Sequence, residues 1–245
     1  MNRSSRARRT EGSPPMPPDG PSADPIRRRL PRGASSLPQE LIVEIQRQRL
    51  LEAMTLEVAE RGYPATSVAD IISRAGVSRK TFYELFSDKE ACYLTGFAEI
   101  ALRHVSAVRA AVRGESEVRN QLMVALRAYL SLFDENPIAA RAFFAEALGA
   151  RAVSPEMATQ WLDYTERFEA LLRRWAERVR ELSPRPMEPI SAITVTMAFG
   201  GVNTFLITKI RVGNAHPLVD HLPALHEFVV NALNLSAAVS ARPKG

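Results

Sequence analysis

Apolar residues recur at helical spacing through most of the chain, and no stretch shows the strict alternation of a half-buried strand. In one short stretch, Val68, Ile71, Ile72 and Ala75 fall at positions i, i+3, i+4 and i+7, which places them on one face of a helix. Gly76 ends this helix, because the chain must turn there and a left-handed backbone costs glycine nothing.

Serine residues mark the start of this helix and of the next one. Ser67 takes the N-cap position with Asp70 three residues later, so each side chain satisfies a backbone donor. Ser78 caps a second helix, in which Phe82 and Phe86 face inward. The residues left for solvent or a partner are Arg79, Lys80, Thr81 and Tyr83. This is the layout of a DNA-reading helix-turn-helix, although an ordinary helical hairpin with a solvated face has the same pattern.

Further helices are predicted on both sides of this pair. A first helix runs from Pro38 to about Arg61, and a fourth, capped by Ser87 with Glu90, runs to about Arg113. Proline and glycine boundaries then predict helices at about 116–133, 137–149, 155–182, 189–212 and 216–238. We expect an all-α fold of about nine helices, divided into a three-helix N-terminal domain over 38–90 and a larger helical domain over 91–245.

The excess positive charge of the chain lies at its amino end. Residues 1–38 hold eight arginines against three acids, a surplus equal to the whole net charge of +5. Residues 1–37 carry many Pro, Ser, Gly and Arg and few large apolar residues, which predicts a disordered basic leader. It is either an inert solvated segment or an arm that adds phosphate contacts, since residues 39–90 hold seven bases against nine acids.

Composition and motifs favour a regulator or binding protein over an enzyme. Cys92 is the only cysteine, which fits a reducing cytoplasm, and no apolar run of the roughly 20 residues of a membrane span is evident. The sequence has no HExxH metal motif, phosphate-binding glycine loop or G-x-S-x-G nucleophile elbow. We therefore expect a cytoplasmic protein with no catalytic residues, no metal and no cofactor.

The run from Gly62 to Tyr93, GYPATSVADIISRAGVSRKTFYELFSDKEACY, resembles the N-terminal domain of the tetracycline-repressor (TetR) family of transcriptional regulators. The matching pieces are Gly62-Tyr63, Thr66-Ser67, Asp70-Ile71, Ala75-Gly76-Val77-Ser78, Thr81-Phe82-Tyr83, Phe86 and Lys89-Glu90. The departures are Ile72, where the family often has alanine, and Glu84-Leu85, where it often has an aromatic residue or histidine. Glu84 places an acid on the recognition helix.

The resemblance implies a homodimeric, ligand-responsive regulator, a repressor, that binds a near-palindromic operator. Arg79, Lys80 and Thr81 are the candidates for base edges. Contacts to phosphates are expected from Thr66, Ser67, Ser78, Tyr83 and Lys89. The alternative is a helical protein–protein adaptor whose N-terminal domain no longer binds DNA. Glu84 and the excess of acids over bases in residues 39–90 favour it.

The second half carries two larger sets of candidate residues. Leu218, Leu222, Leu225, Val229 and Leu233 form a seam that, with Phe199, Val202 and Phe205, we expect to face a twin subunit; a wholly internal core is the alternative. The resemblance also implies a pocket for a largely apolar small effector, lined by aromatic residues that are otherwise ordinary core. These are Phe97, His104, Tyr129, Phe133, Phe143, Phe144, Trp161, Tyr164 and Phe168.

Overall fold

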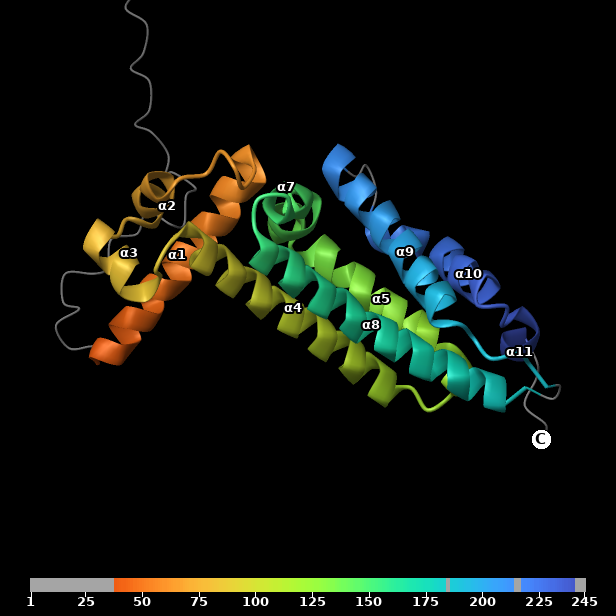
Figure 1. Cartoon of the computed structure of the whole chain (residues 1–245). Helices are drawn as coiled ribbons and strands as arrows, with labels where there is room; N and C mark the ends of the chain where they lie inside the picture. The colour runs from red at the N-terminus through yellow and green to blue at the C-terminus, as the bar shows by residue number, and fades with distance from the viewer. Residues whose placement is uncertain (1–37, 184–185, 214–216, 241–245) are drawn as a thin grey trace, which may run out of the picture.

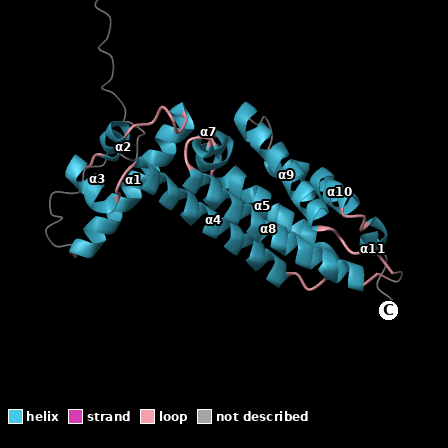
Figure 2. Cartoon of the chain, in the orientation of Figure 1, coloured by secondary structure: helices cyan, strands magenta, loops and turns pink. Residues whose placement is uncertain are grey.

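The structure is a computed structural model that describes residues 38–183, 186–213 and 217–240. These residues form helices and connecting loops without a strand, so the predicted all-α fold is confirmed (Figures 1 and 2). The predicted leader, residues 1–37, lies outside the described residues.

Three helices at the amino end form a small head, drawn in orange to yellow in Figure 1. They are α1 (Gln39–Arg61), α2 (Val68–Ala75) and α3 (Arg79–Leu85). Apolar side chains from all three meet in a common core that holds Leu50, Met54, Val58, Ile71 and Phe82, each fully buried. Ile71 and Phe82 therefore face inward, as the helical periodicity indicated.

The predicted caps and turn of the helix pair are confirmed. The Ser67 and Asp70 side chains each bond the other residue's backbone N–H, which forms a capping box at the start of α2. Gly76 has φ 65° and ψ 35°, the left-handed conformation that glycine adopts without strain. The Ser78 hydroxyl accepts from the Thr81 N–H at 3.0 Å and so caps α3. Local sequence thus fixes the angle between α2 and α3.

A group of charged side chains fastens α1 to α2. Glu57, which is buried, receives Arg74 Nε at 2.6 Å on one carboxylate oxygen and lies 3.2 Å from Arg61 Nε on the other. Arg74 Nη2 also bonds Glu60 at 2.6 Å, and Arg61 Nη1 lies 3.3 Å from Asp70. The carboxylate partners raise the pKa of the Arg74 guanidinium further, against the effect of its partial burial. These contacts hold the helix-turn-helix pair against the first helix.

Three helices form the axis of the body, and the others join or cover them (Figure 1). The three are α4 (Lys89–Gly114), α5 (Gln121–Glu135) and α8 (Pro155–Glu181). Between α4 and α5 lies the 3-10 turn η3 (Val118–Asn120), and between α5 and α8 lie α6 (Pro137–Ala140), the π-helical turn η4 (Arg141–Ala145) and α7 (Ala147–Arg151). Packed on this axis are α9 (Ala192–Val212), the 3-10 turn η5 (Leu218–His221), α10 (Leu222–Ala232) and α11 (Ser236–Ser240).

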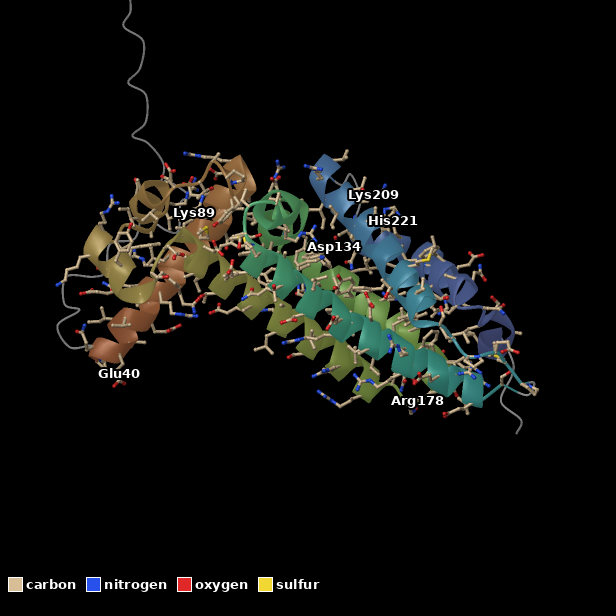
Figure 3. All side chains as sticks on the ribbon, in the orientation of Figure 1. Glu40, Lys89, Asp134, Arg178, Lys209 and His221 are labelled. Carbon is tan, nitrogen blue, oxygen red and sulfur yellow. The ribbon has the colours of Figure 1, made fainter. Side chains whose placement is uncertain are left out.

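The structure corrects three predicted helices. The N-cap of α4 is Asp88, whose carboxylate accepts from the Ala91 N–H at 2.8 Å, and not Ser87. The helix predicted over 137–149 is divided by the π-helical turn. The one predicted over 216–238 is divided at Asn234, whose φ of 55° ends α10, and it begins with η5, where Asp134 accepts from the Leu218 and Val219 N–H groups. Figure 3 labels Asp134, which lies beside this turn.

The expectation that no segment is long enough to span a membrane is also corrected. By length and composition alone, α9 is long and apolar enough to cross a bilayer, and within the described ranges it is the one helix that is. Its Val195, Ala198, Val202 and Leu206 are buried against the rest of the body. The core helix of a globular domain meets the same criterion, so α9 is weak evidence for a membrane span.

Candidate DNA-binding surface and effector cavity

The outer face of α3 carries the basic and hydroxyl groups that the sequence singled out. Arg79 lies with its guanidinium carbon 5.7 Å from the centre of the Tyr83 ring, and both side chains are exposed. Lys80, also exposed, lies 3.5 Å from Glu84 one turn later. Behind them Phe82 is buried and contacts the Phe86 ring, with 5.9 Å between centroids. The helix is therefore anchored on its inner side and free to contact a partner on its outer side.

The structure separates Thr66 and Lys89 from the other predicted phosphate contacts. Thr66 is only 2% exposed and its hydroxyl donates to the Gly62 carbonyl at 2.9 Å, which contradicts a phosphate contact from this side chain. The Lys89 ammonium donates to the Tyr63 and Thr66 carbonyls at 2.9 and 2.7 Å and lies 4.2 Å from the centre of the Tyr63 ring.

Partial burial lowers the pKa of Lys89. Lys89 is labelled in Figure 3 where α4 meets the head. Because its ammonium bonds the Tyr63 and Thr66 carbonyls, it links the loop before α2 to α4. A phosphate contact from Lys89 stays an untested prediction. Ser67 and Ser78 are exposed at the starts of α2 and α3, as predicted.

All the predicted pocket aromatics are buried, and they contact one another in the middle of the body. Phe144 links many of the rings: its centroid lies 4.7 Å from that of Phe133, 5.3 Å from His104 and 5.5 Å from Tyr164. Phe97 stacks near Trp161 at 6.2 Å. The cluster fills space by ring-to-ring packing, so most of it is core and not a pocket wall.

A chain of hydrogen bonds runs through this aromatic cluster and joins four helices. His104 Nδ1 of α4 lies 3.1 Å from the Tyr164 hydroxyl of α8, which donates to the Tyr129 hydroxyl of α5 at 3.1 Å. Tyr129 donates to Asn203 Oδ1 of α9 at 2.9 Å. Burial lowers the pKa of His104 to about 4 and raises those of both tyrosines, so the whole network is uncharged at neutral pH.

A large cavity lies beside this cluster, farther along α8. It has a volume of about 260 Å³ and lies between α4, α5, α8, α9 and α10. Of the predicted pocket residues only Tyr129 and Phe168 line it. The other lining residues are Val108, Val112, Gln121, Leu122, Ala125, Leu126, Leu171, Leu172, Arg174, Trp175, Arg178, Phe199, Val202 and Val229. Sequence reasoning missed most of this wall because aliphatic residues at helical spacing are indistinguishable from solid core.

The remaining predicted pocket residues are placed elsewhere. His104, Phe133 and Phe144 line a separate cavity of about 220 Å³ between α4, the end of α5 and α6. Phe97, Phe143 and Trp161 border a hollow of only about 10 Å³, which is about the room of a single water. Tyr164 lines none of these three. The predicted single aromatic pocket is thus corrected to a packed cluster between two larger cavities.

The predicted dimer seam is corrected as well. Seven of its residues are buried within one subunit, and Phe205 is half-buried, with its ring 5.0 Å from that of His221. The buried seven are Phe199, Val202, Leu218, Leu222, Leu225, Val229 and Leu233. The seam of α10 therefore packs inside its own domain, which was the alternative left open. The exposed large apolar side chains on these helices are different ones, Ile193, Met197, Val212 and Phe228.

Comparison with known proteins gives a match at the head. The profile described as "Bacterial regulatory proteins, tetR family" matches residues 50–95. The transcriptional activator FasR of Mycolicibacterium smegmatis is 31% identical over 114 residues, which span 46% of this chain and about half, 52%, of that relative. The transcriptional regulator EthR of Mycobacterium tuberculosis is 28% identical over 165 residues, covering 64% of this chain and 72% of the relative.

Solved structures extend the likeness to the whole fold. A transcriptional regulator from Pseudomonas aeruginosa superimposes with a TM-score of 0.68 at 17% identity, over 86% of this chain and 99% of the other. FadR from Bacillus subtilis, solved in complex with stearoyl-CoA, gives a TM-score of 0.66 at 19% identity, over 76% and 98%. The head is thus one of the TetR family of bacterial transcriptional regulators, and the chain shares the all-helical fold of these solved structures.

Proposed function

We propose that this protein is a homodimeric repressor that binds a near-palindromic operator and responds to a largely apolar small molecule. The observation that carries DNA binding is the outer face of α3, where Arg79, Lys80 and Tyr83 stand exposed on a helix that Ser78 caps and Phe82 anchors. A short basic helix presented in this way fits the major groove, and a twofold pair of such helices reads two half-sites. It acts in the cytoplasm and catalyses no reaction.

The dimer contact that we propose uses the face of α9 and α10 that the subunit leaves uncovered. Ile193 is 72% exposed and Met197, one turn later, is 70% exposed, and Phe228 of α10 packs its ring against Gly201. Apolar side chains on adjoining helices favour a four-helix contact across a twofold axis. Sedimentation equilibrium should give twice the chain mass of 27.1 kDa. A single-chain mass at working concentration would contradict the homodimer.

The effector site that we propose is the cavity of about 260 Å³, because its wall is mostly aliphatic and aromatic. The FadR relative was solved with stearoyl-CoA, whose acyl chain is likewise apolar. An effector acts only through its differential affinity for the DNA-binding and the released arrangements of the two heads. Titration of the effector into the protein–operator complex should therefore release DNA.

Replacing Arg79 with alanine should weaken operator binding by about 1–3 kcal/mol, roughly five- to 150-fold, and relax the sequence preference. Its guanidinium is exposed beside Tyr83 and has the geometry to grip a guanine bidentately. Gel shifts against the upstream DNA of the gene and against scrambled DNA measure both effects.

The matched control is Arg109→Ala, which removes an exposed arginine from α4 in the body and leaves the head unchanged. If both variants lost the same affinity for operator and for scrambled DNA, the assignment of Arg79 as a base-reading residue would be contradicted. The competing function, a helical protein–protein adaptor, is favoured by Glu84, which lies exposed beside Lys80 on α3. An adaptor gives no sequence-dependent shift even with the unchanged protein.

A further inference from the structure

The polar groups of the large cavity gather at one end of it. Gln121, Arg174 and Arg178 line this end, and Arg178 Nη1 donates to Gln121 Oε1 at 3.3 Å. Gln121 is itself buried and held by a bond from its Nε2 to the Glu115 carbonyl at 2.9 Å. Both arginines are exposed, so this end of the cavity is also where it meets solvent.

Neither arginine is paired with an acid among the described residues. Within the part of the chain that the structure describes, no carboxylate lies within ion-pair distance of Arg174 or Arg178, although other arginines of the chain are paired. Trp175 between them donates its indole N–H to the Val118 carbonyl at 2.8 Å, which holds its ring in the wall. Two cations at the mouth of an apolar cavity complement an anionic group.

The opposite end of the cavity is apolar, and we infer that it is closed because the side chains that line it are buried. Tyr129, Phe168 and Phe199 form it, all three are buried, and the Phe168 and Phe199 rings stack with centroids 5.6 Å apart. The Tyr129 hydroxyl is already bonded to both Asn203 and Tyr164, so this end presents ring faces to a ligand. An apolar chain end fits there, and a second polar group does not.

The two ends of the cavity lie at different distances from the head. Figure 3 shows Arg178 near the carboxyl end of α8, on the far side of the body from the head. The closed aromatic end lies nearer the middle of the body, where Tyr129 joins the hydrogen-bonded chain to His104 on α4. A ligand with one charged end is therefore oriented by the cavity.

We propose that this cavity binds an unbranched aliphatic chain that carries an anionic group, with the anion at Arg174 and Arg178 and the chain end against Tyr129, Phe168 and Phe199. The inference rests on the proposed function only in making this molecule the effector. The anion is either the carboxylate of a free fatty acid or a phosphate of a thioester such as an acyl-CoA. Both use the same two guanidinium groups, and the closed end sets the longest chain that fits.

The test is direct calorimetric titration of the full-length protein with three probes: decanoate, decanoyl-CoA and 1-decanol. The first two carry an anionic group and 1-decanol does not. We expect decanoate or decanoyl-CoA to bind about tenfold or more tightly than decanol, since a charge-assisted hydrogen bond contributes about 1.5–3 kcal/mol. The double variant Arg174→Gln, Arg178→Gln should lose this preference and still bind decanol as the unchanged protein does. Arg173→Gln, an exposed neighbour outside the wall, should keep the preference.

Each result decides the proposal. Equal affinity for decanol and both anionic probes, no binding of any of them, or a preference that survives in the double variant would overturn it. Preference for decanoate identifies a carboxylate as the anion, and preference for decanoyl-CoA alone identifies a phosphate. Octanoate, dodecanoate and palmitate then locate the length limit, and an affinity that rises through palmitate without limit contradicts the closed end. The calorimetric assay contains no DNA and therefore tests this site alone. If the probe binds but does not release the operator, the site is supported and its role as the effector site is contradicted.

Discussion

Phe144→Ala is expected to lower the free energy of unfolding by about 3–5 kcal/mol, the range for a buried phenylalanine truncated to alanine. Phe144 is only 2% exposed and its ring contacts those of Phe133, His104, Tyr164 and Trp161. These neighbours come from α4, α5 and α8, which hold one another in place and collapse poorly into a void. The loss therefore includes the transfer of the ring to water and an unfilled cavity.

Urea denaturation followed by circular dichroism measures this loss. The control is Leu162→Ala on α8, which removes a side chain that is 59% exposed and should change stability by no more than about 0.5 kcal/mol. If the two variants unfolded at the same urea concentration, the aromatic cluster would not be the structural centre of the body.

Glu57→Ala is expected to cost about 3 kcal/mol, because it removes the buried partner of an ion pair and leaves Arg74 with Glu60 alone and Arg61 with Asp70 alone. Glu57 bonds Arg74 at 2.6 Å and lies 3.2 Å from Arg61, so its loss affects two guanidinium groups between α1 and α2. Arg74 is partly exposed, which keeps the value at the low end of the range. The angle of the helix-turn-helix pair depends on these contacts, so operator affinity should fall with stability.

Glu60→Ala is the matched comparison, because Glu60 bonds the same Arg74 at 2.6 Å from an exposed position. Removing an exposed partner should cost at most about 1 kcal/mol. Thermal unfolding of the two variants at equal protein concentration compares them. Equal losses would mean that burial of Glu57 does not set the strength of this ion-pair group.

The head was predictable because its determinants are local. A serine cap, a glycine in the left-handed conformation and phenylalanines one turn apart act within a few residues, and each is found where the sequence indicated. Lys89 and Thr66 were harder to place. Their partners, the carbonyls of residues 62–66, are backbone groups of a loop whose path the side-chain pattern does not specify.

The body was less predictable because its outcome depends on which helices meet. Spacing shows that Leu218, Leu222 and Val229 share a face, but it does not show whether that face is covered by the same chain or by a twin. The cavity depends on space left unfilled, which no residue type signals. Arg174 and Arg178, four apart on α8, look in sequence like an ordinary solvated face.

The π-helical turn over Arg141–Ala145 carries two adjacent rings that face different parts of the molecule. Phe143 packs against Tyr93 and leaves no room for a side chain at position 96, while Phe144 faces the aromatic cluster. Deleting one residue here would restore α-helical winding and rotate one flanking segment relative to the other by about 100°. The number of residues in this turn, and not only their identity, sets which ring packs on α4 beside Tyr93 and which enters the aromatic cluster.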